Sequence, residues 1–369
     1  MDQQTPTRPD ARPIPETQRR AQPRAVIAGT GGYLPEAAVS NDELSRTVDT
    51  SDAWIRERTG IGQRHIAAPH ETCAFMATRA AERALAAAGM QAAEVDAILL
   101  ATATPDEAFP ATALRVQAAL GAGGFGFDLS AACSGFIYGL ATAEAMIAAG
   151  RIRTALVIGS EVYSRIMNWQ DRGTCVLFGD GAGAVVLRAG QAGAGLPGIL
   201  SVHLHSDGRL GDILYVDGAV GRRDKPGHLV MNGREVFRHA VTRRSETVEE
   251  ALAANGLDKS AIDWLVPHQA NKRIIDAIGK RLGLPAERVV TTVERHANTS
   301  AASVPLALDE AVRDGRIKPG DLVLMEALGG GLTWGSALAR MYGRSRAPSA
   351  RGSDARFTAL CQPFDPANS

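Results

Sequence analysis

The sequence predicts an α/β protein built from two similar halves. Ala-rich helical stretches alternate with short runs of Val, Ile and Leu, which is typical of a buried sheet covered by helices. Residues 84–99 align without a gap against residues 251–266, and in both a helix stops at a glycine before an Asp leads into a strand. Residues 150–153 similarly match residues 315–318. Two copies of one unit are therefore expected, with the half boundary between about residues 190 and 226.

Composition restricts the class of protein. A chain of 369 residues with 45% hydrophobic content can bury one large core or two ordinary ones. The 40 basic and 40 acidic residues give zero net charge, so no global field attracts nucleic acid or a membrane. The four cysteines include no C-x-x-C pair, which argues against a disulfide scaffold or a metal site. With no apolar run of membrane-spanning length and no signal peptide, we expect a cytoplasmic enzyme.

The order of elements begins after a polar tail. Residues 1–24 are rich in Pro, Gln and Arg and predict a disordered segment, as do residues 344–369. The first strand starts at residue 25 and runs into a glycine turn, but Pro35 stands where a dinucleotide-binding helix would begin. We therefore expect an N-terminal half over residues 25–200 and a C-terminal half over residues 201–343.

Residues 50–60 predict a short helix capped by Ser51 or Asp52. Trp54 and Arg58 are four residues apart and so share one face. An indole beside a guanidinium suits an adenine ring and its phosphates, whereas inward packing of Trp54 with Arg58 in water is the equally simple alternative.

Residues 127–140 predict a strand, a turn of small residues and a helix with Cys133 at its start. The helix N-terminus is expected to lower the pKa of this thiol toward the nucleophilic thiolate. Ser134 and Gly135 keep the turn narrow enough for a substrate to reach the sulfur. The alternative is that Cys133 is a small buried apolar residue.

The internal repeat places two more polar residues near Cys133. Counted from the matched glycines, Asn298 occupies the equivalent strand-to-helix corner of the second half, and His268 follows a strand of that half. Sites in α/β proteins form beyond the carboxyl ends of strands. Taken singly, His268 could be a structural histidine and Asn298 a helix cap, but the topology predicts that these two residues and Cys133 converge.

The chain resembles the β-ketoacyl-acyl carrier protein synthase III family, the condensing enzymes of the thiolase fold, over residues 25–343. The resemblance implies two βαβαβαββ halves related by a pseudo-twofold axis in a five-layer αβαβα arrangement. Its motifs, in order, are residues 50–55, 101–110, the Cys133 turn, 171–174, 178–183, 231–237, 268–271, 298–303 and 329–335.

The resemblance implies a decarboxylative Claisen condensation of an acyl-CoA primer, acetyl-CoA or similar, with malonyl-acyl carrier protein (malonyl-ACP). Cys133 would accept the acyl group, and His268 and Asn298 would bind the malonyl thioester carbonyl. The backbone N–H groups of Cys133 and Gly330 would form the oxyanion hole. The products would be 3-oxoacyl-ACP, CO₂ and CoA at the start of fatty acid biosynthesis, with no cofactor.

Further roles follow from the same resemblance. Trp54, Arg58 and Arg172 match residues that contact coenzyme A, and Phe109 matches a residue that lines the primer pocket across a homodimer interface. Leu328 stands where many relatives carry an aromatic residue, which gives the pocket a different volume and shape and leaves open a primer other than acetyl.

Basic residues cluster at the proposed entrance, where they would attract an acidic acyl carrier protein. Lys272 and Arg273 are its expected docking residues. For Arg243 and Arg244, which have acidic neighbours, a solvated helix face is favoured instead.

Other classes of protein remain as alternatives. A condensing enzyme of polyketide or alkylquinolone biosynthesis shares the triad and differs only in substrate. A papain-like protease uses the same residue types in the same order, but the surroundings of Cys133 lack the protease motif. A catalytically silent scaffold would not need all three polar groups, and thiolases proper need a second cysteine in a matching motif.

Overall fold

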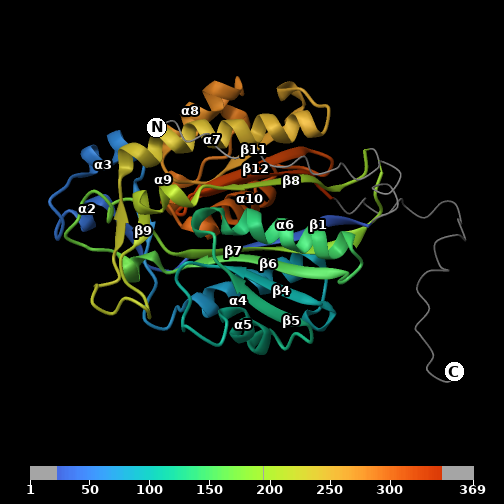
Figure 1. Ribbon diagram of the computed structural model, residues 1–369, viewed down its shortest axis with the longest axis horizontal. Coiled ribbons are helices and arrows are strands. Elements are labelled where there is room, and N and C mark those ends of the chain that lie inside the picture. The colour runs from blue at the N-terminus through green and yellow to red at the C-terminus, as the bar shows by residue number, and fades with distance from the viewer. Residues whose placement is uncertain (1–22, 194, 343–369) are drawn as a thin grey trace, which may run out of the picture.

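The computed structural model describes residues 23–193 and 195–342, which form five layers (Figure 1). Two sheets enclose a central layer that contains α6 (Gly135–Ala148) and α10 (Ser303–Arg313), and these helices contact strands of both sheets. Helices α4 (Cys73–Ala88) and α5 (Thr112–Leu120) cover the first sheet, and α7 (Gly233–Ala254) covers the second and contacts α8 (Lys272–Leu282). The predicted five-layer αβαβα architecture is confirmed.

The first half follows the βαβαβαββ order. Its sheet has the strand order β1-β7-β6-β4-β5, in which β4 runs parallel to β5 and β6, and β7 runs antiparallel to β1 and β6. Its strands are β1 (Arg24–Tyr33), β4 (Ala97–Ala101), β5 (Phe125–Leu129), β6 (Thr154–Glu161) and β7 (Gly181–Gly190).

The second half has one strand fewer than expected. Its sheet has the order β11-β12-β13-β8, and the position equivalent to β5 is only a single bridge between Leu265 and Val289. The side chain of Gln269 donates to the Val290 carbonyl and accepts from the Thr292 and Val293 N–H groups, so these groups cannot extend a ladder. Its strands are β8 (Gly198–Ser206), β11 (Trp264–Pro267), β12 (Leu322–Gly329) and β13 (Thr333–Arg340).

Smaller elements surround the two sheets. The short strands are β2 (Ala38–Ser40), β3 (Gln63–His65), β9 (Leu214–Val216) and β10 (Leu229–Met231). The short α-helices are α2 (Asn41–Leu44), α3 (Asp52–Thr59) and α9 (Val293–His296). The 3₁₀ turns are η1 (Ala92–Glu94), η2 (Ala132–Ser134), η3 (Tyr163–Ile166), η4 (Gly208–Ile213), η5 (Lys259–Ala261), η6 (Ala286–Arg288) and η7 (Ser300–Ala302).

The structure confirms the sequence repeat. In the first copy, α4 leads through η1 into β4, and in the second, α7 leads through η5 into β11. Gly89 and Gly256 end the two helices with φ of 65° and 62°, a left-handed conformation that glycine adopts without the steric cost of a Cβ. The second matched pair is α6 followed by β6 and α10 followed by β12.

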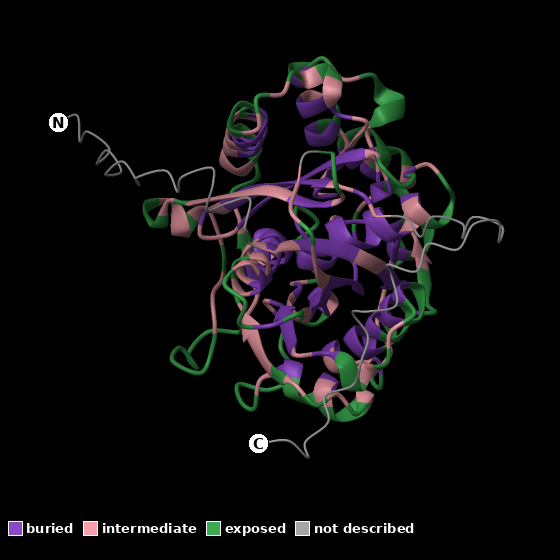
Figure 2. Ribbon diagram, turned by 90° about the vertical axis from the view of Figure 1, so that its right-hand side faces the viewer, coloured by how far each residue is buried: buried purple, intermediate pink, exposed green. Residues whose placement is uncertain are grey.

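The central helix α6 is apolar on several faces because sheets lie on both sides of it. Phe136, Ile137 and Leu140 are fully buried within the largest core cluster, as expected for a helix with no solvent face. Figure 2 shows buried residues through the middle of the molecule and exposed ones on the outer helices and loops. No helix in the described ranges has the length and apolar character needed to cross a bilayer.

Two expected boundaries need correction. Arg24 opens β1 and pairs with Gly190, so the first strand begins one residue before residue 25. The chain leaves the first sheet after Gly190 and enters the second at Gly198, so a boundary at residue 200 would cut β8. The remainder of the expected tails, residues 1–22 and 344–369, lies outside the described residues.

Candidate active site

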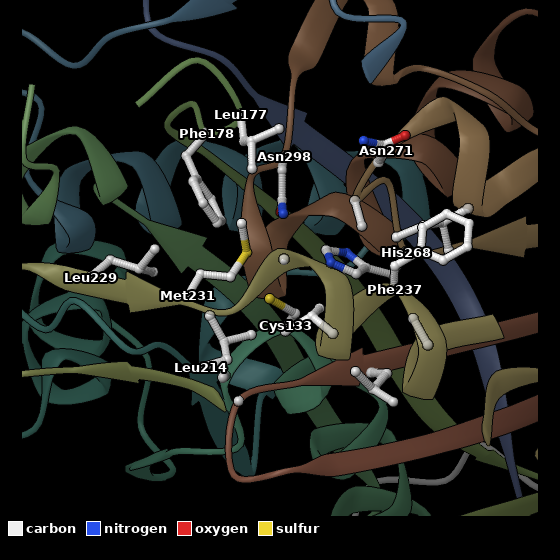
Figure 3. Close-up of a pocket in the computed structure, with 18 of the residues that line it drawn as sticks. Cys133, Leu177, Phe178, Leu214, Leu229, Met231, Phe237, His268, Asn271 and Asn298 are labelled. Atoms are coloured by element: carbon white, nitrogen blue, oxygen red, sulfur yellow. The ribbon is translucent and has the colours of Figure 1, made fainter. Parts of the chain in front are cut away.

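The three predicted site residues line one cavity of about 640 Å³. Cys133 lies in η2 just before α6, His268 directly follows β11, and Asn298 precedes η7 and α10. Figure 3 shows the His268 ring and the Asn298 amide directed toward the space beside the Cys133 sulfur. The topology therefore brings together residues that are far apart in the sequence.

The amide of Asn298 is oriented by its neighbours. Its backbone N–H donates to the Leu177 carbonyl at 2.9 Å, and its carbonyl accepts from the Gly179 N–H at 3.1 Å. Its side-chain Oδ1 accepts from the Ser300 N–H at 2.9 Å. Because Oδ1 is engaged, the amide NH₂ is the group left to serve the cavity as a donor.

The imidazole of His268 is neutral and held in place. The residue is 2% exposed, and burial, followed by the charge of Arg244, lowers its pKa well below the ordinary value. Its Nδ1 lies 2.6 Å from the Ser303 hydroxyl. The Gln269 N–H also donates to that hydroxyl oxygen at 3.4 Å, and in the tautomer protonated on Nε2 the hydroxyl donates to Nδ1.

The thiol of Cys133 corrects one expectation. Cys133 is 5% exposed, and burial raises its pKa to about 11, against hydrogen bonding and the charge of Arg244, which lower it. The start of α6 therefore does not produce a free thiolate at neutral pH, because desolvation outweighs the stabilisation of the charged form.

The glycine-rich segment after β12 lies against the Cys133 turn. A Cβ added to Gly329 would stand 2.5 Å from the Cys133 backbone nitrogen, so only glycine permits this approach. The Thr333 hydroxyl donates to the Ala131 carbonyl at 2.9 Å and lies 2.7 Å from the Ser134 hydroxyl. Gly330 lines the cavity beside Cys133.

A second polar layer lies close to Cys133. Ser300 donates to the Tyr163 hydroxyl at 3.0 Å, and Tyr163 lines the cavity. Glu161 is fully buried and accepts from Thr104 at 2.6 Å, while burial raises its pKa to about 7. This layer supports the cavity wall and contributes a carboxyl group that titrates near neutral pH.

The guanidinium groups of two arginines lie against the Trp54 ring. Ser51 caps α3 by accepting from the Trp54 N–H, and the Arg58 guanidinium lies 4.5 Å from the centre of the Trp54 ring. The Arg172 guanidinium lies 5.2 Å from the same ring. Trp54 and Arg58 also line the cavity, so the expected aromatic-basic group forms part of the same cavity wall as Cys133.

Of the other predicted residues, two line the cavity and two do not. Leu328 and Arg273 line the cavity, with Leu328 only 4% exposed. Lys272 begins α8 beside Arg273 and forms an ion pair with Asp276. Phe109 does not line the cavity of its own chain and is 85% exposed.

No cluster of three or more His, Cys, Asp or Glu side chains suited to a metal occurs within residues 23–193 and 195–342.

Sequence reasoning missed two residues that contact His268. Ser303 is part of a recognised motif but received no role, and Arg244 was expected on a solvated face. That second expectation is wrong, because Arg244 is fully buried and lines the cavity. The signal was the spacing of Ala240, Arg244 and Val248, which repeats every four residues along the buried side of α7.

Comparisons with known proteins match this architecture. A family model described as 3-oxoacyl-[acyl-carrier-protein] synthase III matches residues 127–208, and the model of its C-terminal part matches residues 252–341. A protein named beta-ketoacyl-[acyl-carrier-protein] synthase III from Acidiphilium cryptum is 70% identical over 318 residues, covering 86% of this chain and 99% of the relative. A protein of the same name from Granulibacter bethesdensis is 67% identical over 320 residues, with the same two coverages.

Solved structures give the same answer for the fold. The 3-oxoacyl-[acyl-carrier-protein] synthase III of Aquifex aeolicus superimposes with a TM-score of 0.81 at 46% identity, covering 86% of this chain and 99% of that one. The priming beta-ketosynthase of the R1128 polyketide pathway superimposes with a TM-score of 0.83 at 37% identity, covering 90% and 99%. The arrangement of layers predicted from the sequence is therefore shared with known condensing enzymes.

Proposed function

This chain belongs to the 3-oxoacyl-[acyl-carrier-protein] synthase III family, and on that premise we propose that it condenses an acyl-CoA primer with malonyl-ACP. The products are 3-oxoacyl-ACP, CO₂ and CoA, and the reaction opens fatty acid biosynthesis. The protein is an acyltransferase of the condensing type. The observation that carries the proposal is the cavity in which one thiol meets two neutral hydrogen-bond donors.

The first half-reaction transfers the primer to Cys133. The sulfur attacks the primer thioester carbon, a new C–S bond forms, and the C–S bond to CoA breaks. Because the pKa of Cys133 is raised to about 11, the thiol proton leaves during attack and ends on the departing CoA thiolate. The backbone N–H groups of Cys133 and Gly330 are the proposed donors to the oxyanion.

The second half-reaction uses His268 and Asn298. Both donate to the thioester carbonyl of malonyl-ACP, so that when the bond to CO₂ breaks, the enolate oxygen already has two donors. The enolate carbon attacks the acyl-Cys133 carbonyl, and the thiolate leaves and takes up one proton. Every step uses only side chains, backbone groups and substrates, so the proposal includes no metal or other cofactor.

Substrate delivery is assigned to the charged mouth of the cavity. Trp54, with Arg58 and Arg172 against its ring, is proposed to hold the adenine and phosphates of CoA. Lys272 and Arg273 are proposed to dock the acidic carrier protein. The free thiols of the three described cysteines fit a reducing, cytoplasmic location.

A homodimer is the proposed assembly. Strand β5 is an edge of its sheet, and an unpaired edge is a template for pairing with another chain. Phe125 on β5, Leu114 on α5 and Phe109 expose 48%, 38% and 85% of their surfaces, forming apolar area that a second copy would cover. In this assembly Phe109 reaches the primer pocket of the partner.

The proposed primer is acetyl-CoA or a similar acyl-CoA, with Leu328 and Phe109 as its proposed pocket residues, and Leu328 in place of an aromatic residue is the feature that would shift the preference away from acetyl. The alternative, a priming synthase of polyketide biosynthesis, has a structural counterpart at 37% identity. It is not favoured, because the relatives at 67% and 70% identity carry the synthase III name.

The test is reconstitution with acetyl-CoA and malonyl-ACP, following CO₂ release and the mass of the carrier protein. Wild type should form 3-oxobutyryl-ACP, Cys133→Ala should not, and His268→Ala and Asn298→Ala should accept the primer without condensing it. Absence of any 3-oxoacyl-ACP with acyl-CoAs of every length tested would contradict the proposal.

A further inference from the structure

A buried ion pair lies behind His268 and joins α7 to β12. The side chains of Arg244 and Glu326 are both 0% exposed. Arg244 Nη2 donates to Glu326 Oε1 at 2.6 Å, and Arg244 Nε donates to the other carboxylate oxygen. This is the two-pronged geometry in which a guanidinium fixes a carboxylate in one orientation.

Arg244 holds the backbone carbonyl of His268, and the backbone of β12 holds its N–H. Arg244 Nη2 also donates to the His268 carbonyl at 3.0 Å, and the His268 N–H donates to the Glu326 backbone carbonyl at 2.8 Å. The preceding residue, Pro267, pairs with Glu326, and this is the last pair in the parallel ladder of β11 and β12. The backbone of His268 is therefore fixed on both sides immediately after its strand ends.

Stability alone does not account for this arrangement. A buried ion pair contributes about as much as well-packed apolar residues of the same volume, and often less. Arg244 Nη1 is, in addition, buried without a hydrogen-bond partner, so the desolvation of this N–H group is not compensated. The pair contacts His268, and Arg244 lies in the cavity wall. Its burial is therefore better explained by a functional role than by stability.

We propose that Arg244 and Glu326 are positioning residues that aim the Nε2–H of His268 at the malonyl thioester carbonyl. This inference rests on the proposed function, because it assigns the pair to the condensation half-reaction in which His268 acts. Acylation of Cys133 needs no donor from His268, so the pair should affect it only through the charge of Arg244, which is the smallest of the influences on the pKa of the thiol. The charge of Arg244 also favours the neutral imidazole, the form that serves as a neutral donor.

Two variants separate positioning from folding. Arg244→Met with Glu326→Leu removes both charges and keeps most of the buried volume, a replacement that proteins often tolerate. Arg244→Lys keeps the charge but cannot hold Glu326 and the His268 carbonyl at once. The matched control is Lys259→Met. It removes an exposed ion pair with Glu249, which, like Arg244, lies on α7.

The experiment times both half-reactions by intact mass, first the acylation of Cys133 by acetyl-CoA and then its discharge by malonyl-ACP. In the double variant we expect acylation within about threefold of wild type and condensation slower by about 100-fold, in kcat rather than KM, as for a misplaced catalytic group. Lys259→Met should match wild type in both.

Equal slowing of the two half-reactions, or unchanged condensation in a folded variant, would overturn the positioning role. If the double variant does not fold, Arg244→Lys decides by the same comparison of rates. Failure of wild type itself to acylate Cys133 or to condense would instead refute the proposed function, and the two failures are therefore distinguishable.

Discussion

The Ser303 hydroxyl lies 2.6 Å from Nδ1 of His268, where it can donate to a neutral imidazole that carries its proton on Nε2. Ser303 opens α10 in the central layer, whereas His268 follows a strand of the second sheet. The serine oxygen also accepts from the Gln269 N–H, and in the tautomer protonated on Nε2 the serine proton goes to Nδ1. The Nε2–H that remains is the donor which the proposed condensation needs.

Ser303→Ala should therefore slow condensation. Loss of the bond leaves a buried nitrogen unpaired and frees the ring to change tautomer, at a cost of about 1–3 kcal/mol, or about 5- to 150-fold in rate. The measurement is the rate of 3-oxoacyl-ACP formation from preacylated enzyme. Ser303→Thr, which keeps the hydroxyl, should restore most of the rate, and full activity in Ser303→Ala would refute the assignment.

The reactivity of Cys133 in the free enzyme should depend steeply on pH. Because its pKa is raised to about 11, the protonated thiol predominates below that pH and the thiolate fraction grows about tenfold for each unit of pH. Alkylation by iodoacetamide, followed by mapping of the Cys133 peptide, should accelerate from pH 7 to pH 10 without a plateau. A plateau beginning below pH 8 would indicate a stabilised thiolate instead.

Trp54→Ala should weaken the use of acyl-CoA without impairing the chemistry. It removes the ring against which Arg58 and Arg172 lie, and cation–π contacts contribute about 0.5–2 kcal/mol. We expect KM for acetyl-CoA to rise about 3- to 30-fold with kcat nearly constant. Kinetics at saturating malonyl-ACP check this, with Trp169→Ala, a partly exposed tryptophan that is absent from the cavity wall, as the control.

Phe109→Asp should disrupt the proposed homodimer. A carboxylate placed where the chain exposes an apolar ring would have to be desolvated at the interface, which opposes association. Sedimentation velocity should show wild type as a dimer and the variant shifted toward monomer. A wild-type monomer at micromolar concentration would contradict the assembly.

Much of the site was predictable from the sequence because of its internal symmetry. The aligned glycines placed Cys133 and Asn298 at equivalent corners, and the strand ending at Pro267 placed His268 near them. The resemblance then supplied the chemistry of each residue and the contacts of Trp54.

The remainder depends on interactions that sequence patterns do not reveal. The acidic neighbours of Arg244 indicated a solvated helix face, yet its partner Glu326 is 82 residues away along the chain. The pKa of Cys133 is set by desolvation, which depends on what packs over the turn. The missing fifth strand reflects Gln269, whose side chain takes the hydrogen bonds that a ladder would have used.

The central claim is that Cys133 carries the acyl group between two substrates, and intact-mass spectrometry tests it directly. After incubation with a panel of acyl-CoAs, the protein should gain one acyl group on the Cys133 peptide, and malonyl-ACP should then remove it as 3-oxoacyl-ACP. Cys133→Ala should gain nothing. If no acyl-CoA modifies Cys133, or if malonyl-ACP leaves the acylated enzyme unchanged, the account is contradicted.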